Sequence, residues 1–146
     1  PHLPVSGLRP QHARSLHVDY GGEFTFDPMY KPLTSVPVFA GFFRSVRLAQ
    51  EEVAAGLAIR EPVLVAHSDR SGDFNNPSSE ELRSTDVVLN VEDMTRLAPN
   101  LGSNVTTLEV LGGRHDLALS QKPSRDLYTR ESIAWALDVA GNETRY

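Results

Sequence analysis

Apolar residues recur along this chain at two different spacings, which predict its helices and strands. Residues 37–56 (PVFAGFFRSVRLAQEEVAAG) carry apolar residues at helical spacing and end at a glycine, so we expect an amphipathic helix. These apolar residues are Phe39, Phe42, Phe43, Val46 and Val53. Residues 61–67 (EPVLVAH) form a continuous apolar run after a glutamate and a proline, which is typical of a buried parallel strand. Residues 1–36 are interrupted by prolines and glycines, which favours short elements only.

The second half of the chain continues this alternation of helix and strand patterns. Residues 90–102 begin at Asn90, a good N-cap residue, and end at a glycine, which predicts a helix. Residues 104–113 alternate as a half-buried strand does, and residues 124–139 have the composition of a final helix. The order helix, strand, helix, strand, helix predicts an α/β fold with parallel strands and flanking helices.

Composition and charge narrow the class of protein. The 146 residues amount to one domain's worth of chain, and the net charge of -5 without a basic run argues against nucleic-acid binding. Without cysteine, disulfides and thiolate metal sites are excluded. No apolar stretch is long enough to span a membrane, and residues 1–10 lack the apolar core of a signal peptide, so we expect a cytoplasmic protein. The chain starts at Pro1 rather than at a methionine, and we expect it to be part of a longer polypeptide.

Titratable residues follow both predicted strands at their carboxyl ends. His115 comes after Gly112 and Gly113, whereas Asp69, Asp73 and Asp86 follow the first strand. In open α/β sheets, sites gather beyond these strand ends, and a carboxylate bonded to an imidazole fixes its tautomer for proton transfer. A histidine after a glycine pair is more often an ordinary turn residue, so the spacing alone leaves both readings open.

The polar segment 68–85 (SDRSGDFNNPSSEELRST) lies between the first strand and Asp86. A loop of this length often borders a site, and we expect Ser78 or Ser79 to cap a short helix within it. His67, Asp69 and Asp73 raise the question of a metal site. With no second histidine at ligand spacing and no cysteine, we interpret them as solvated loop residues and expect no metal.

Two stretches resemble α/β-hydrolase-fold enzymes of the lysophospholipase or monoglyceride-lipase-like branch, the serine aminopeptidase type. STDVVLNVEDMTRLAPNLGSNVTTLEVLGGRHDLALS is similar to their C-terminal segment, and LHVDYGGEFTFDPMYKPLTSVPVFAGFFRSVRLAQ to the segment before their acid strand. The resemblance implies a serine hydrolase of carboxylic esters with an apolar part, without metal or organic cofactor. Asp86 falls at the triad acid and His115 at the triad histidine. Residues 1–56 correspond to the cap and connecting helix, and 57–146 to the C-terminal part of the core.

The sequence departs from this family's pattern at the acid and at the nucleophile. The family's acid follows its strand within a few residues, so the intervening segment keeps Asp69 and Asp73 as rival acids. The elbow pattern Gly-x-Ser-x-Gly occurs nowhere in the 146 residues. We therefore expect the serine to lie upstream of Pro1. The exposed edge of an incomplete sheet favours pairing, so we also expect either the missing N-terminal part of the same polypeptide or self-association. The alternative is a catalytically silent α/β domain that binds a small apolar ligand or a protein partner.

Aromatic residues are concentrated before the first strand. The chain has six Phe, four Tyr and one Trp, and most of these lie between residues 20 and 43. They are Tyr20, Phe24, Phe26, Tyr30, Phe39, Phe42 and Phe43. They are interpreted either as ordinary core packing or as a cap that lines an apolar acyl or alcohol pocket, and the resemblance favours the cap.

Overall fold

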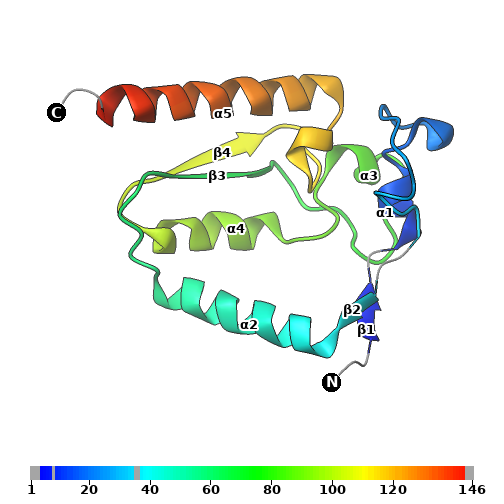
Figure 1. Cartoon of the computed structure of the whole chain (residues 1–146), viewed down its shortest axis with the longest axis horizontal. Helices are drawn as coiled ribbons and strands as arrows, with labels where there is room; N and C mark the ends of the chain where they lie inside the picture. The colour runs from blue at the N-terminus through cyan, green and yellow to red at the C-terminus, as the bar shows by residue number, and fades with distance from the viewer. Residues whose placement is uncertain (1–3, 8, 35–36, 144–146) are drawn as a thin grey trace. The chain divides into compact units, whose positions relative to one another are not determined.

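The structure is a computed structural model that describes residues 4–7, 9–34 and 37–143 (Figure 1). The elements, with η denoting 3₁₀ helices, are β1 (Pro4–Gly7), α1 (Pro10–Arg14), η1 (Val18–Tyr20), β2 (Pro37–Phe39), α2 (Ala40–Ala55), β3 (Val63–Ser68), α3 (Glu81–Ser84), α4 (Val91–Leu97), η2 (Ala98–Leu101), β4 (Val105–Val110), η3 (Leu117–Leu119) and α5 (Lys122–Glu143). The contacts within the chain divide it between Ala55 and Gly56 into two compact units, each described by itself below.

The first unit contains a two-stranded antiparallel sheet and the helix α2. The helix predicted over 37–56 begins only at Ala40, because Pro37–Phe39 pair with β1 as the strand β2. The interpretation of the aromatic residues as ordinary core packing is wrong for five of the seven, because their side chains are exposed. They are Tyr20, Tyr30, Phe39, Phe42 and Phe43.

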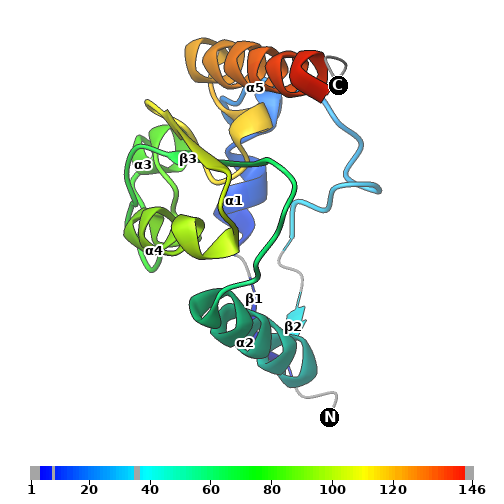
Figure 2. The same cartoon turned by 90° about the vertical axis from the view of Figure 1, so that its left-hand side faces the viewer.

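The second unit is built on a parallel pair of strands. β3 and β4 run in register from Val63 opposite Val105 to Ser68 opposite Val110. The helix α5 lies on one face of this pair and α4 on the other, as Figures 1 and 2 show. The structure thus confirms the general α/β class and the parallel strands, and both strands end at the same edge of the sheet.

Helix ends in the second unit follow from local chemistry. The side chain of Asn90 accepts the backbone N–H of Glu92 at 2.9 Å, which confirms the predicted N-cap of α4. The helix predicted over 90–102 is α-helical only to Leu97 and continues as η2, where Pro99 lacks the N–H that an α-helical turn requires. α5 is longer than the predicted 124–139, since its polar ends continue the helix beyond the apolar residues.

The core of the second unit lies where the helices meet the sheet. Val110 at the end of β4 is fully buried, and Val87, Val91, Ala98 and Leu117 are nearly so. The side chain of Trp135 on α5 donates a hydrogen bond to Thr106 Oγ1 on β4 at 3.2 Å. This contact makes the only tryptophan of the chain a reporter for the packing of α5 on the sheet.

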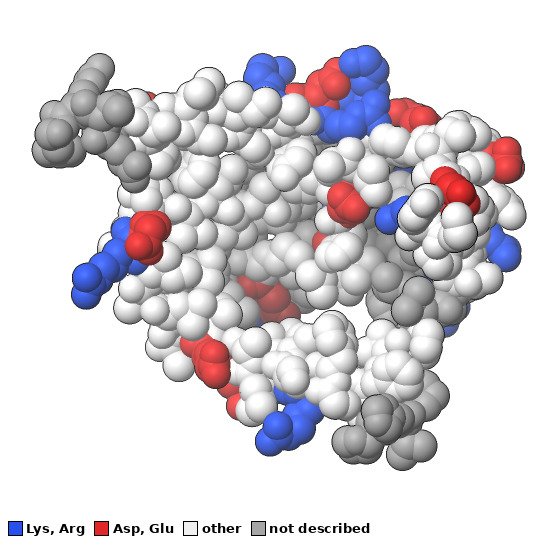
Figure 3. Space-filling model, viewed as in Figure 1, with Lys and Arg blue, Asp and Glu red and all other residues white. Residues whose placement is uncertain are grey.

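Two surface properties bear on the class of protein, the apolar length of the helices and the distribution of charge. In the part of the chain that the structure describes, no helix has the length and apolar character that crossing a bilayer requires. Figure 3 shows lysine and arginine side chains in separate groups on one face, with acidic side chains and uncharged surface between them. The charge distribution on this face therefore offers no continuous basic track for a nucleic-acid backbone.

Candidate acid–histidine site

The polar segment after β3 leaves the sheet and returns to it at Asp86. Residue Asp86 forms a parallel bridge with Ser71, three residues beyond the end of β3. Its backbone carbonyl accepts the N–H of Gly72 at 2.8 Å, and its own N–H donates to the carbonyl of Arg70 at 3.0 Å. The loop therefore does not displace the carboxylate from the strand end, although many residues separate the two in sequence.

The loop between β3 and Asp86 is stabilised by hydrogen bonds within the loop. Ser78 and Glu81 bond reciprocally: Ser78 Oγ accepts the N–H of Glu81 at 3.1 Å, and the Glu81 carboxylate accepts the N–H of Ser78 at 2.8 Å. These bonds have the pattern of a capping box at the turn that leads into α3, whose N-cap position is Glu80, and they involve Ser78 rather than Ser79. Backbone and side-chain hydrogen bonds from Ser78, followed by the N–H of Asp73, lower the pKa of Glu81.

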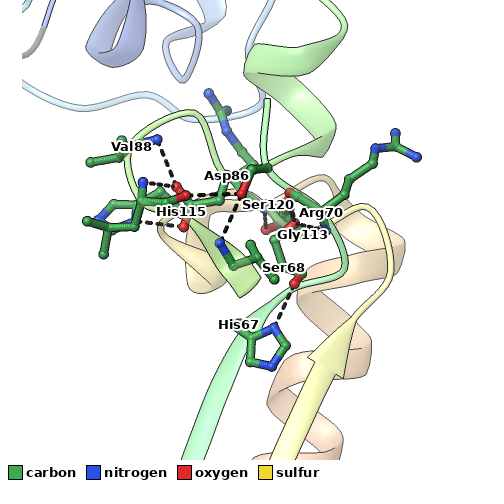
Figure 4. Close-up of polar contacts among 12 residues, drawn as sticks. His67, Ser68, Arg70, Asp86, Val88, Gly113, His115 and Ser120 are labelled. Carbon is green, nitrogen blue, oxygen red and sulfur yellow. Dashed lines mark hydrogen bonds and ion pairs between the residues drawn. The ribbon is translucent and has the colours of Figure 1, made fainter. Parts of the chain in front are cut away.

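Asp86 and His115 meet at the carboxyl edge of the sheet. His115 Nδ1 lies 3.0 Å from Asp86 Oδ2, and Figure 4 shows the two side chains pointing toward each other. The other carboxylate oxygen, Oδ1, accepts the backbone N–H groups of Val88 and Leu89, both at 2.8 Å. Asp86 is only 2% exposed. Its carboxylate is held in one orientation by these three donors.

These contacts shift both pKa values toward an ion pair. Burial raises the pKa of Asp86, but hydrogen bonds from His115 and from the N–H groups of Leu89 and Val88 outweigh it, so the pKa is lowered. The hydrogen bond to Asp86 raises the pKa of His115 against the opposing effect of burial. With the Nδ1 proton directed to Asp86, Nε2 is the atom of His115 that remains for proton exchange.

The imidazole of His115 is partly exposed. Within the described residues, Nε2 makes no hydrogen bond, and the side chain is 42% exposed. His115 lines an open hollow of about 620 Å³ whose walls come from β3, η3 and α5. Its apolar lining includes Leu64, Ala66, Leu117, Tyr128 and Trp135. A second molecule or polypeptide segment can therefore reach the exchanging nitrogen.

The structure does not bring the rival acids to His115. Asp69 Oδ1 accepts the N–H of Gly112 at 2.8 Å, and Asp73 Oδ1 accepts the N–H groups of Asn75 and Asn76 in an exposed turn. Among the three candidate aspartates, Asp86 alone contacts the imidazole in the structure's description of this region.

The interpretation of His67 as a solvated loop residue is wrong. His67 lies in β3 and is 4% exposed, because both ring nitrogens have partners inside the protein. Nδ1 lies 2.7 Å from the carbonyl of Ser68, and Nε2 lies 3.4 Å from Thr95 Oγ1. The described residues contain no group of three or more histidine or acidic side chains arranged to hold a metal ion.

Similarity to known proteins does not inform the function of this site. No protein-family model, curated protein or solved structure matches the chain. The resemblance to α/β-hydrolases therefore stays a prediction from the sequence, and the functional argument depends on the geometry of Asp86 and His115.

Sequence reasoning missed the side chains that bond the turn before His115. Each of the four successive residues 111–114 has one backbone group bonded to a side chain. The contacts are Ser124 Oγ to the Leu111 carbonyl at 2.7 Å, the Gly112 N–H to Asp69 Oδ1 at 2.8 Å, Ser68 Oγ to the Gly113 carbonyl at 2.7 Å, and the Arg114 N–H to Ser120 Oγ at 2.9 Å. Serines in a polar stretch give no signal of such a role, whereas Asp69, directly after a strand, was at least a candidate.

The Asp86–His115 pair predicts how stability depends on pH. A lowered Asp86 pKa contributes stability above the ordinary carboxyl pKa of 3.8, and this is lost as the pH falls through the folded-state value. A raised His115 pKa contributes stability below the ordinary histidine pKa of 6.5, and this is lost as the pH rises through the folded-state value. The pair therefore stabilises most between these two ordinary values.

His115→Asn tests this window, because the asparagine amide keeps a donor near the Nδ1 position but does not titrate. We expect urea unfolding, followed by Trp135 fluorescence, to show the largest loss of unfolding free energy between pH about 4 and about 6.5. Asp93→Asn is the control, since Asp93 pairs with Arg96 in an exposed i,i+3 contact on α4. A loss that stays constant from pH about 5 to about 8 would contradict the assignment.

Proposed function

We propose that this chain supplies the acid and base of a serine hydrolase that acts on carboxylic esters. His115 is the general base and Asp86 orients it and stabilises its protonated form. One observation carries the proposal: a buried carboxylate holds Nδ1 of His115, while the imidazole, whose Nε2 has no hydrogen bond among the described residues, lines an open hollow. This is the arrangement that proton transfer from a hydroxyl nucleophile requires.

The chemistry follows from the two nitrogens. As a serine Oγ attacks the ester carbonyl, Nε2 accepts the hydroxyl proton, and the resulting imidazolium is stabilised by Asp86. The imidazolium then returns the proton to the departing alkoxide, which leaves an acyl-serine. In the second half, Nε2 takes a proton from water as the water oxygen attacks the acyl carbon. The bond from that carbon to serine Oγ then breaks, the carboxylic acid leaves, and the imidazolium returns the proton to Oγ.

Four serines at the strand ends and around the turn before His115 are committed to other contacts, whereas Ser132 lines the same hollow as His115 and has a buried Oγ without a hydrogen-bond partner among the described residues. The hydroxyls of Ser68 and Ser124 donate to backbone carbonyls, and those of Ser71 and Ser120 accept backbone N–H groups. None of them is bonded to His115, and the sequence has no Gly-x-Ser-x-Gly elbow. The proposal therefore places the nucleophile on a serine outside residues 1–146.

The hollow beside His115 supports an ester with an apolar part. Its walls at Leu64, Ala66, Leu117 and Trp135 offer carbon surface to an acyl or alcohol group, and His115 lies at its lining. Asp116 also lines the hollow, which disfavours a negatively charged group at that point. A neutral ester fits this lining better than an anionic one.

A covalent probe tests the proposed reaction. The protein that contains this chain is isolated from its native source and treated with a fluorophosphonate, which phosphonylates a serine activated by a histidine base. We expect one adduct, mapped by peptide mass spectrometry to a serine outside residues 1–146, together with loss of p-nitrophenyl ester hydrolysis.

The competing results are distinct. An adduct on a serine within residues 1–146 would move the nucleophile into this chain and overturn that part of the proposal. No adduct and no ester hydrolysis, in a protein that is folded, would favour the catalytically silent binding domain. The intact mass of the isolated protein shows whether residues 1–146 occur with further polypeptide.

A further inference from the structure

We propose that Asp69 is the positioning residue that fixes the turn 111–114, and with it His115, relative to Asp86. This deepens the proposed function and rests on it for the role of His115 as base. Asp69 follows directly after β3, and its side chain is only 12% exposed. Its carboxylate accepts the N–H of Gly112, three residues before His115.

Asp69 connects the two strand ends at two points. Its backbone N–H donates to the carbonyl of Val110 at 3.2 Å, and its carboxylate accepts the N–H of Gly112 at 2.8 Å. The two contacts thus bond the residues on either side of Leu111, which is the first residue after β4. A hydrogen bond to a carboxylate is roughly twice as strong as one between neutral groups, so Asp69 is the strongest of the four side-chain contacts to the turn.

The backbone of the turn 111–114 does not fix its own conformation, so it depends on hydrogen bonds from side chains outside the turn. Gly112 has a φ of 65°, in the left-handed region that a glycine enters and leaves without a steric penalty. Gly113 follows under tight packing, since a Cβ there would lie 2.7 Å from Leu117 Cδ2 and 2.9 Å from the Val110 carbonyl. Two consecutive glycines give no preferred orientation of their own, so the contacts to side chains decide where His115 lies.

A charged link between the supports of the acid and of the histidine passes through Asp69. Asp86 is supported from the β3 side, where its N–H donates to the carbonyl of Arg70, the residue next to Asp69. His115 is supported from the β4 side by the turn 111–114. The Asp69–Gly112 contact joins these two supports, so it sets the separation of Nδ1 and Oδ2 without touching either atom. A second link runs through Ser68, whose Oγ bonds the carbonyls of both Arg70 and Gly113, at 3.0 and 2.7 Å.

Two substitutions separate the hydrogen bond from the charge. Asp69→Asn keeps an oxygen acceptor for Gly112 and removes the charge, whereas Asp69→Ala removes both. The readout is the pKa of His115 in the 146-residue chain, measured by NMR with ¹³C-labelled histidine and assigned by comparison with His115→Asn. Asp86 and Asp116 are the charged groups that act on His115, and both are unchanged in these variants.

We expect Asp69→Ala to move the pKa of His115 back toward its ordinary value, because the Asp86 hydrogen bond is no longer held in place. The Gly112 amide should lose at least about tenfold in hydrogen-exchange protection, as expected for the loss of a bond to a charged acceptor. Asp69→Asn should restore most of both signals. Asp73→Ala is the control, since its carboxylate bonds only the exposed turn at Asn75 and Asn76.

The opposite results are equally clear. An unchanged His115 pKa in a folded Asp69→Ala protein would overturn the proposal, as would an Asp69→Asn protein that behaves like Asp69→Ala. Because the readout is the imidazole itself and needs no nucleophile, the positioning role can fail while ester hydrolysis stands. Ester hydrolysis can likewise fail while the positioning role stands.

Discussion

His115→Asn is expected to abolish ester hydrolysis while leaving the fold intact. The asparagine amide can donate to Asp86 from near the Nδ1 position, so the buried carboxylate keeps its third hydrogen bond. The variant has nothing at the Nε2 position, and no other group accepts the serine proton. We expect kcat to fall on the order of 10⁶-fold, the loss that follows removal of a triad histidine. Turnover of p-nitrophenyl acyl esters is measured in the polypeptide that contains both this chain and the proposed serine.

Chemical rescue separates catalysis from structure in this experiment. His115→Ala leaves a space beside the open hollow, so added imidazole can occupy it and restore part of the activity. A variant that lost activity through misfolding would not respond to imidazole. Asp93→Asn is the control, because Asp93 lies on α4 of the same unit and pairs with Arg96 in an exposed contact. Near-normal turnover by folded His115→Asn would contradict the assignment of His115 as the base.

The positions of Asp86 and His115 were predictable from the sequence because they depend on strand order. Parallel strands end at one edge of a sheet, so residues after β3 and β4 were expected to meet there, and they do. The choice among three aspartates was not fixed by spacing. It depends on the segment 69–85 folding back so that Asp86 pairs beside Ser71, a tertiary contact that no local pattern encodes.

Other features were missed because neighbouring groups decide them. His67 carries a polar ring at a strand end, which favours solvent, but the Ser68 carbonyl and Thr95 Oγ1 allow it to be buried. Residues 37–39 share the helical spacing of the segment after them, and pairing with β1 makes them a strand instead. In both cases the local pattern favoured a different structure, and tertiary hydrogen bonds decided the outcome.

Asp86→Asn is expected to lower kcat by about 10⁴-fold with little change in the position of His115. The asparagine oxygen can still accept the N–H groups of Val88 and Leu89, which currently bond Oδ1. The amide nitrogen then faces His115 Nδ1 and donates to it, so the imidazole carries its proton on Nε2. The neutral base is lost at the atom that needs it, and the imidazolium loses its stabilising charge.

The pKa of His115 gives an independent signature of the same change. Because the hydrogen bond to Asp86 is the largest cause of its raised pKa, Asp86→Asn should lower the pKa of His115, visible by NMR in the 146-residue chain. Asp73→Asn, in an exposed turn away from the imidazole, should leave both kcat and this pKa at the parent values. Asp69→Asn retains the acceptor for Gly112 and should lose far less activity than Asp86→Asn. A larger loss for Asp69→Asn than for Asp86→Asn would make Asp69 the acid, and would require the segment 69–85 to rearrange when the nucleophile is present.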